Sequence, residues 1–106
     1  MSGDPQGCGA PAGGVAVTEN SSGEAIIEGT VTGDGAPASV GYARLLNEGG
    51  EFVAEVPLGP DGGFRFFAAP GTWTVRVLAP RGARAEETVT ADRGHTTTVA
   101  LSVAAP

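Results

Sequence analysis

The chain of 106 residues carries 12 acidic and 6 basic side chains, which gives a formal net charge of −6, and its length allows one domain at most. A net negative chain repels phosphate groups, so neither a nucleic acid nor an anionic membrane surface is an expected partner. No apolar run approaches the roughly 20 residues that span a bilayer, and the N-terminus lacks the basic and apolar regions of a secretion signal, so we expect a cytoplasmic protein.

The first 23 residues consist mainly of Gly, Pro, Ser and Ala, and after Met1 their only large apolar side chains are Val15 and Val17. Such a segment gains too little from burial to offset its conformational entropy, so residues 1–23 are predicted to form a flexible tail, with a short edge strand at 15–18 as the alternative. The predicted domain occupies residues 24–106. The single cysteine, Cys8, cannot form an intrachain disulfide, and a reducing cytosol keeps it a free thiol.

From residue 24 onward, apolar and polar residues alternate in short segments separated by Gly-, Pro- and Asn-rich turns about every ten residues. This period of two is typical of strands with one buried face, and no window shows helical apolar spacing. The sequence therefore predicts an all-β fold, a seven-stranded antiparallel Greek-key β-sandwich. The predicted strands cover residues 24–31, 39–46, 52–58, the segment that follows the turn at 59–62, and residues 73–79, 85–91 and 95–103.

The aromatic side chains divide between the expected core and the expected surface. Phe52, Phe64, Phe66 and Trp73 occupy inward positions of their strands, where packing alone accounts for them. Phe67 follows Phe66 and therefore points to the outer face. Surfaces that combine arginine and aromatic residues are enriched at protein interfaces, so one shared outer face is the predicted partner-binding surface, although Phe67 packed under a loop or under the tail is an alternative. The predicted binding residues are Tyr42, Arg44, Arg65, Phe67 and Arg76.

Few residues in this chain could carry chemistry. Cys8 is the only strong nucleophile, and a thiolate on a mobile tail could accept a sulfane sulfur from a partner's persulfide. His95 is the only imidazole and stands next to a turn, where a surface role is expected. One Cys and one His fall short of the three or four ligands of a metal site, so no metal and no cofactor are expected. Glu86 and Glu87 are neighbours in a strand and point to opposite faces, which excludes a catalytic carboxylate pair.

Several motifs together resemble the carboxypeptidase regulatory-like domain of the transthyretin-like group. They are Ile27-x-Gly29-x-Val31, Gly35-x-Pro37, Arg44-Leu45, Asp61-Gly62-x-Phe64-x-Phe66 and the run from Pro70 to Val75. The resemblance covers residues 24–103 and implies the same sandwich. It does not extend to the hydroxyisourate hydrolases of that group, because this chain has a single His and ends in Ala-Ala-Pro.

A second resemblance is narrower. The stretches 42–46, 51–56 and 64–74 and the Cys8-Gly9 pair are similar to a small uncharacterised actinobacterial family, some of whose members are named SseC. Its members are encoded beside a thiosulfate sulfurtransferase of the rhodanese type. The resemblance implies a non-enzymatic accessory protein of sulfur metabolism that docks on such a sulfurtransferase, with Cys8 as sulfane-sulfur acceptor. In members that begin Met-Cys-Gly the cysteine lies six residues closer to the start than Cys8.

Two alternatives remain at this stage. The sandwich could be a structural or protein-binding module, including a homodimer formed through an edge strand, in which Cys8 has no role. Binding of a carbohydrate or small molecule by the loops ranks last, because the only side chain suited to stacking on a sugar, Trp73, is expected in the core.

Overall fold

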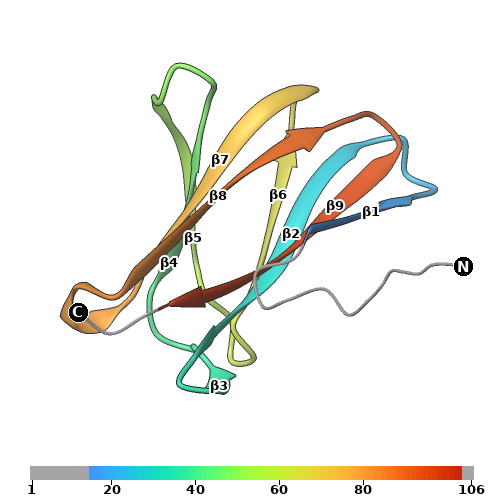
Figure 1. Cartoon of the computed structure of the whole chain (residues 1–106). Helices are drawn as coiled ribbons and strands as arrows, with labels where there is room; N and C mark the ends of the chain where they lie inside the picture. Colours follow the sequence, from blue (N-terminus) through green and yellow to red (C-terminus); the bar gives the residue numbers. More distant parts are fainter. Residues whose placement is uncertain (1–14, 104–106) are drawn as a thin grey trace, which may run out of the picture.

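The computed structural model describes residues 15–103 of the chain. In this part the chain folds into two β-sheets that pack face to face, with a single short 3-10 turn, η1, at Pro80–Gly82. Figure 1 shows the two layers, with β4, β5, β7 and β8 in one and β1, β2, β6 and β9 in the other. The described chain is therefore all-β, as the alternating pattern predicts.

Nine strands make up the two sheets of the described chain. They are β1 (Val15–Glu19), β2 (Ala25–Gly33), β3 (Ala36–Pro37), β4 (Tyr42–Leu46), β5 (Phe52–Pro57), β6 (Gly63–Ala68), β7 (Gly71–Leu78), β8 (Arg84–Ala91) and β9 (His95–Val103).

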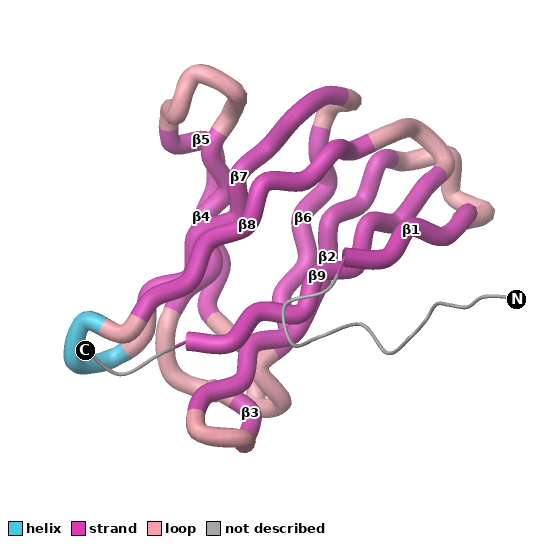
Figure 2. Tube along the Cα trace, in the orientation of Figure 1, coloured by secondary structure: helices cyan, strands magenta, loops and turns pink. Residues whose placement is uncertain are grey.

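The first sheet has β2 and β9 at its centre. β2 pairs with β9 on one side and with β6 and the short β3 on the other, while β1 pairs with the outer edge of β9. The second sheet has the order β5-β4-β7-β8, and all its pairs are antiparallel. Most loops lie at the two ends of the sandwich, as the tube in Figure 2 shows.

The core lies between the two sheets and is built from the inward positions of the alternating strands. Ile27, Val31, Leu45, Val75 and Val99 have almost no exposed surface. Alternate residues of β2, β4, β6, β7, β8 and β9 supply most of this cluster, which is the arrangement expected for strands buried on one face. Each large aliphatic side chain buried in this way contributes roughly 1.5–3 kcal/mol to stability.

Two features of the strand arrangement differ from the sequence-based prediction. The described chain has nine strands rather than seven: β1 forms at the position of the alternative edge strand at 15–18, and β3 adds two residues beside β2. The central pair β2–β9 is parallel, so the sandwich is not purely antiparallel. Alternation shows which residues share a face, but it carries no information on the direction in which two distant strands pair.

Phe52 was predicted in the core and is instead 60% exposed. The reason is a bulge in the pairing of β4 with β5: Leu45 pairs with Ala54, but the next residue, Leu46, pairs with Phe52. The extra residue on β5, Val53, moves Phe52 to the outer face. There its ring lies beneath the Arg44 guanidinium, whose carbon is 5.5 Å from the ring centroid.

This placement predicts a small effect for substitution of Phe52. Phe52→Leu should lower the free energy of unfolding by no more than about 1 kcal/mol, because an exposed ring stabilises the fold mainly through its cation–π contact. Urea unfolding of Phe52→Leu, Arg44→Gln and the double variant would measure this. A coupling energy near zero would contradict the contact with Arg44, and a loss above about 3 kcal/mol would contradict the exposed position.

Candidate functional site

The outer face of the second sheet carries a row of four charged residues, one from each strand. Arg44 stands opposite Glu55 on one side and Arg76 on the other, and Arg76 stands opposite Glu86. The Nη2 of Arg44 is 2.8 Å from the Oε1 of Glu55, and the Nε of Arg76 is 2.8 Å from the Oε1 of Glu86. The two glutamates thus offset the repulsion between two adjacent guanidinium groups, and the row as a whole carries no net charge.

Tyr42 precedes this row on β4 and is 51% exposed. It stands opposite Leu78 in β7, and Leu78 in turn stands opposite Arg84 in β8. Together with Phe52 on the other side of the charged row, Tyr42 gives the outer face of the second sheet two exposed aromatic rings.

The outer face of the first sheet carries a different and more apolar group, which we call the Phe67 patch (Ile26, Glu28, Arg65 and Phe67). Phe67 is 65% exposed and pairs in register with Ile26, whose side chain is buried outside the core cluster. Two residues along, the Nε of Arg65 is 3.0 Å from the Oε1 of Glu28. The patch therefore combines an exposed ring, an aliphatic side chain beside it and one compensated ion pair.

The five predicted binding residues do not share one surface. Arg65 and Phe67 belong to β6 in the first sheet, whereas Tyr42, Arg44 and Arg76 belong to β4 and β7 in the second. The two outer faces point away from each other across the sandwich. The prediction of one outer face is wrong because the period of two separates inside from outside but does not assign a strand to a sheet. The sequence does support an outward position for each of the five.

The glutamate partners and Ile26 did not emerge from the sequence. The signal for Ile26 was present, because two adjacent isoleucines in a strand must face opposite sides, so that one of them lies outside the core. The ion pairs depend on cross-strand register, which the sequence does not reveal. Because of these ion pairs, each of the three arginines predicted to bind a partner is already bound to a glutamate.

The remaining chemistry-bearing residues are dispersed. Cys8 lies outside the described residues. His95 begins β9, and its Nδ1 lies 3.0 Å from the carbonyl oxygen of Arg93, to which it donates. Trp73 is partly buried against the core, and its indole N–H donates to the carbonyl of Ala69 at 2.8 Å. Residues 15–103 contain no group of three or more His, Cys, Asp or Glu side chains placed to hold a metal ion.

The fold and the two outer faces define a small two-sheet β protein with exposed aromatic residues on both sides. The chain belongs to a family of proteins of unknown function, DUF1416, whose pattern matches residues 8–103. In the described part of the chain, no helix has the length and apolar character of a membrane span.

Curated relatives of this chain come from mycobacteria. An uncharacterized protein of Mycolicibacterium smegmatis is 52% identical over 61 residues, which cover 56% of this chain and 67% of the relative. Two uncharacterized proteins of Mycobacterium tuberculosis are each 48% identical over 60 residues, or 56% of this chain and 60% of the relative. The chain thus spans about two thirds or less of these relatives. The resemblance to a small uncharacterised actinobacterial family is confirmed.

Proposed function

We propose that this protein is a non-enzymatic, cytoplasmic accessory protein of sulfur metabolism that docks on a rhodanese-type thiosulfate sulfurtransferase. The proposal rests on the sequence resemblance to a family encoded beside such sulfurtransferases. The seven longer strands from β2 onward, in this proposal, form the Greek-key core of a carboxypeptidase regulatory-like, transthyretin-like domain.

The Phe67 patch is the docking surface in this proposal. Phe67 is 65% exposed, and Ile26, which pairs with it in register, places an aliphatic side chain beside the ring. Rings of this kind are enriched at interfaces because they bury a large area at low conformational cost. The Arg65–Glu28 pair at the border supplies polar groups that suit the rim of an interface.

Cys8 is the sulfur acceptor in this proposal. The Cys8 thiolate attacks the outer sulfur of the partner's cysteine persulfide, a new S–S bond forms on Cys8, and the partner's thiolate leaves. The sulfane sulfur changes carrier without any external oxidant. The composition of the segment that carries Cys8 predicts flexibility, and a cysteine on a flexible segment suits this step because it can enter a partner's active site while the sandwich stays docked.

The docking prediction is tested by replacing Phe67. Phe67→Glu should weaken binding to the rhodanese-type sulfurtransferase at least tenfold, or about 1.4 kcal/mol, because it places a charge in an apolar contact. Val53→Glu is the matched control, since Val53 is a 49% exposed apolar residue on the other sheet. Calorimetric titration of both variants measures the effect. Equal binding by Phe67→Glu and the native protein would exclude this face.

The sulfur-transfer prediction is tested by intact mass spectrometry after incubation with thiosulfate and the active sulfurtransferase. A gain of about 32 Da, the mass of one sulfur atom, that reductant removes and that is lost in Cys8→Ser is expected. An unchanged mass beside an active sulfurtransferase would favour the alternative: a structural or protein-binding module, including a homodimer paired through one of the edge strands β1, β5, β6 or β8, with no role for Cys8.

A further inference from the structure

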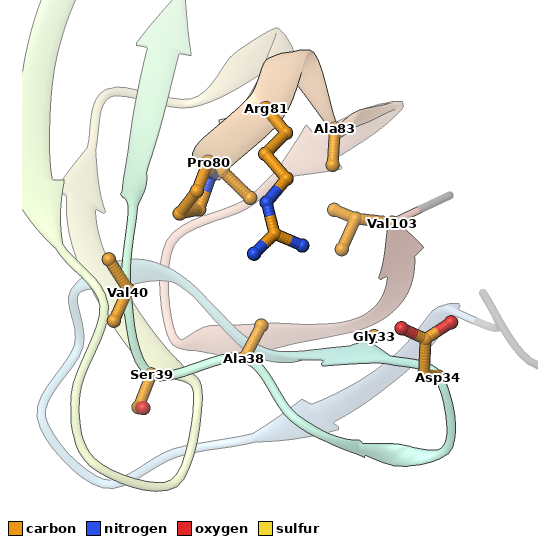
Figure 3. A pocket seen from close by; sticks show the side chains of 10 residues that line it. Gly33, Asp34, Ala38, Ser39, Val40, Pro80, Arg81, Ala83 and Val103 are labelled. Atoms are coloured by element: carbon orange, nitrogen blue, oxygen red, sulfur yellow. The ribbon is translucent and has the colours of Figure 1, made fainter. Parts of the chain in front are cut away.

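A pocket of about 310 Å³ opens at one end of the sandwich, between the turn that joins β2 to β3 and the turn that joins β7 to β8. Figure 3 shows the Arg81 side chain projecting into this space from one side, with Asp34 at the other. A volume of this size lies at the lower end of the range for small-molecule sites. The apolar side chains of the wall are Ala38, Val40, Ala79, Pro80, Ala83 and Val103.

Both turns place a non-glycine residue in the left-handed region of the backbone. Asp34 has φ 54° and is followed by Gly35 at 78°, while Arg81 has φ 63° and is followed by Gly82 at 75°. Asp-Gly is a preferred pair for such tight hairpin turns, so turn chemistry explains Asp34. Arginine has no such preference, and a left-handed conformation costs a non-glycine residue roughly 1–2 kcal/mol. The backbone alone would favour Asn or Gly at position 81.

Within residues 15–103 the exposed guanidinium of Arg81 forms no ion pair, and neither do those of Arg84 and Arg93. Arg44, Arg65 and Arg76, in contrast, are each bound to a glutamate opposite them in the sheet. Asp34 lines the same pocket, yet no ion pair joins it to Arg81. The hairpin accounts for the left-handed backbone, but an arginine at that position, in place of Asn or Gly and beside a partly apolar pocket, is better explained by a ligand than by folding.

We propose that this pocket binds a small organic acid with one carboxylate and a short apolar chain. The planar guanidinium of Arg81 pairs with the carboxylate, for which its geometry is suited. The apolar chain packs along Val40 and Val103. Asp34 repels a second carboxylate at the far side, so the pocket prefers a monocarboxylate to a dicarboxylate. This site is separate from the Phe67 patch and does not depend on sulfur transfer.

The test is an NMR titration of isotope-labelled protein with pentanoate, glutarate and pentanol as probes. Pentanoate should shift the amide signals of Gly35, Val40 and Gly82, and should bind more tightly than either of the other two. Arg81→Gln should weaken pentanoate binding about tenfold. Arg84→Gln is the matched control. It removes the same charge three residues along the chain, and the Arg84 side chain does not line the pocket.

Two further variants separate a ligand role from a structural one. Asp34→Asn, which keeps a residue suited to the left-handed turn, should narrow the preference for pentanoate over glutarate. Arg81→Asn should raise the melting temperature while pentanoate binding is lost. Unchanged binding in Arg81→Gln, an equal loss in Arg84→Gln, or shifts confined to another part of the molecule would each overturn the proposal.

Discussion

Replacing Gly29 by alanine should lower the free energy of unfolding by at least about 3 kcal/mol. Gly29 lies in the middle of β2, between β9 and β6, where it stands opposite Val99 and Phe64. A Cβ atom at this position would lie 2.1 Å from the Val99 carbonyl oxygen and 2.7 Å from the Phe64 ring. A ring can move, but the carbonyl belongs to the backbone of the central strand pair. The clash therefore forces β2 and β9 apart.

Chemical denaturation followed by far-UV circular dichroism would measure this effect. Gly49→Ala is the matched control, because its Cβ would meet nothing closer than 3.5 Å, at the side chain of Asn47, and its loss should stay below about 1 kcal/mol. Adding Phe64→Leu to Gly29→Ala should not restore stability, because the carbonyl stays in place. Full recovery in that double variant would show that the ring, not the β2–β9 pairing, makes glycine necessary.

The sequence predicts strands β2 and β4 to β9, and it predicts which face of the sheet most of their residues occupy, for a simple physical reason. Burial of one face imposes a period of two, and this period is clear at Ile27 and Val31, at Phe64 and Phe66, and at Val75. The two-sheet sandwich follows from the number of short strands. Membership of a small uncharacterised actinobacterial family was predicted from the resemblance of three stretches and the Cys8-Gly9 pair, and the family match confirms it.

What the sequence did not predict depends on contacts between distant segments. The bulge that turns Phe52 outward is a property of two strands in register, and neither strand shows it alone. The assignment of Arg65 to one sheet and Arg44 to the other is a matter of topology. The left-handed backbone of Arg81 is set by the hairpin that it closes, and its sequence context, Pro-Arg-Gly, indicates only a turn.

The largest core effect is expected at Ile27. Its side chain is fully buried between the sheets, and β2, its strand, lies at the centre of the first sheet. Ile27→Ala should cost about 2–5 kcal/mol, from lost burial and from the cavity that remains in a core too rigid to collapse fully. The free energy of unfolding of a domain of this size is roughly 5–15 kcal/mol, so this one substitution removes a large part of the stability.

Ile26→Ala is the control that links stability to binding. Ile26 is the same residue type in the same strand, but it lies outside the core cluster and pairs with Phe67 on the outer face. Ile26→Ala should lower the free energy of unfolding by less than Ile27→Ala, because Ile26 keeps 9% of its surface exposed and lies outside the core cluster, whereas Ile27 is fully buried within it. Ile26→Ala should instead weaken docking on the sulfurtransferase. Ile27→Ala, measured under conditions in which the variant is still folded, should leave docking unchanged. A stability loss in Ile26→Ala equal to that of Ile27→Ala would mean that the Phe67 patch serves the fold rather than a partner.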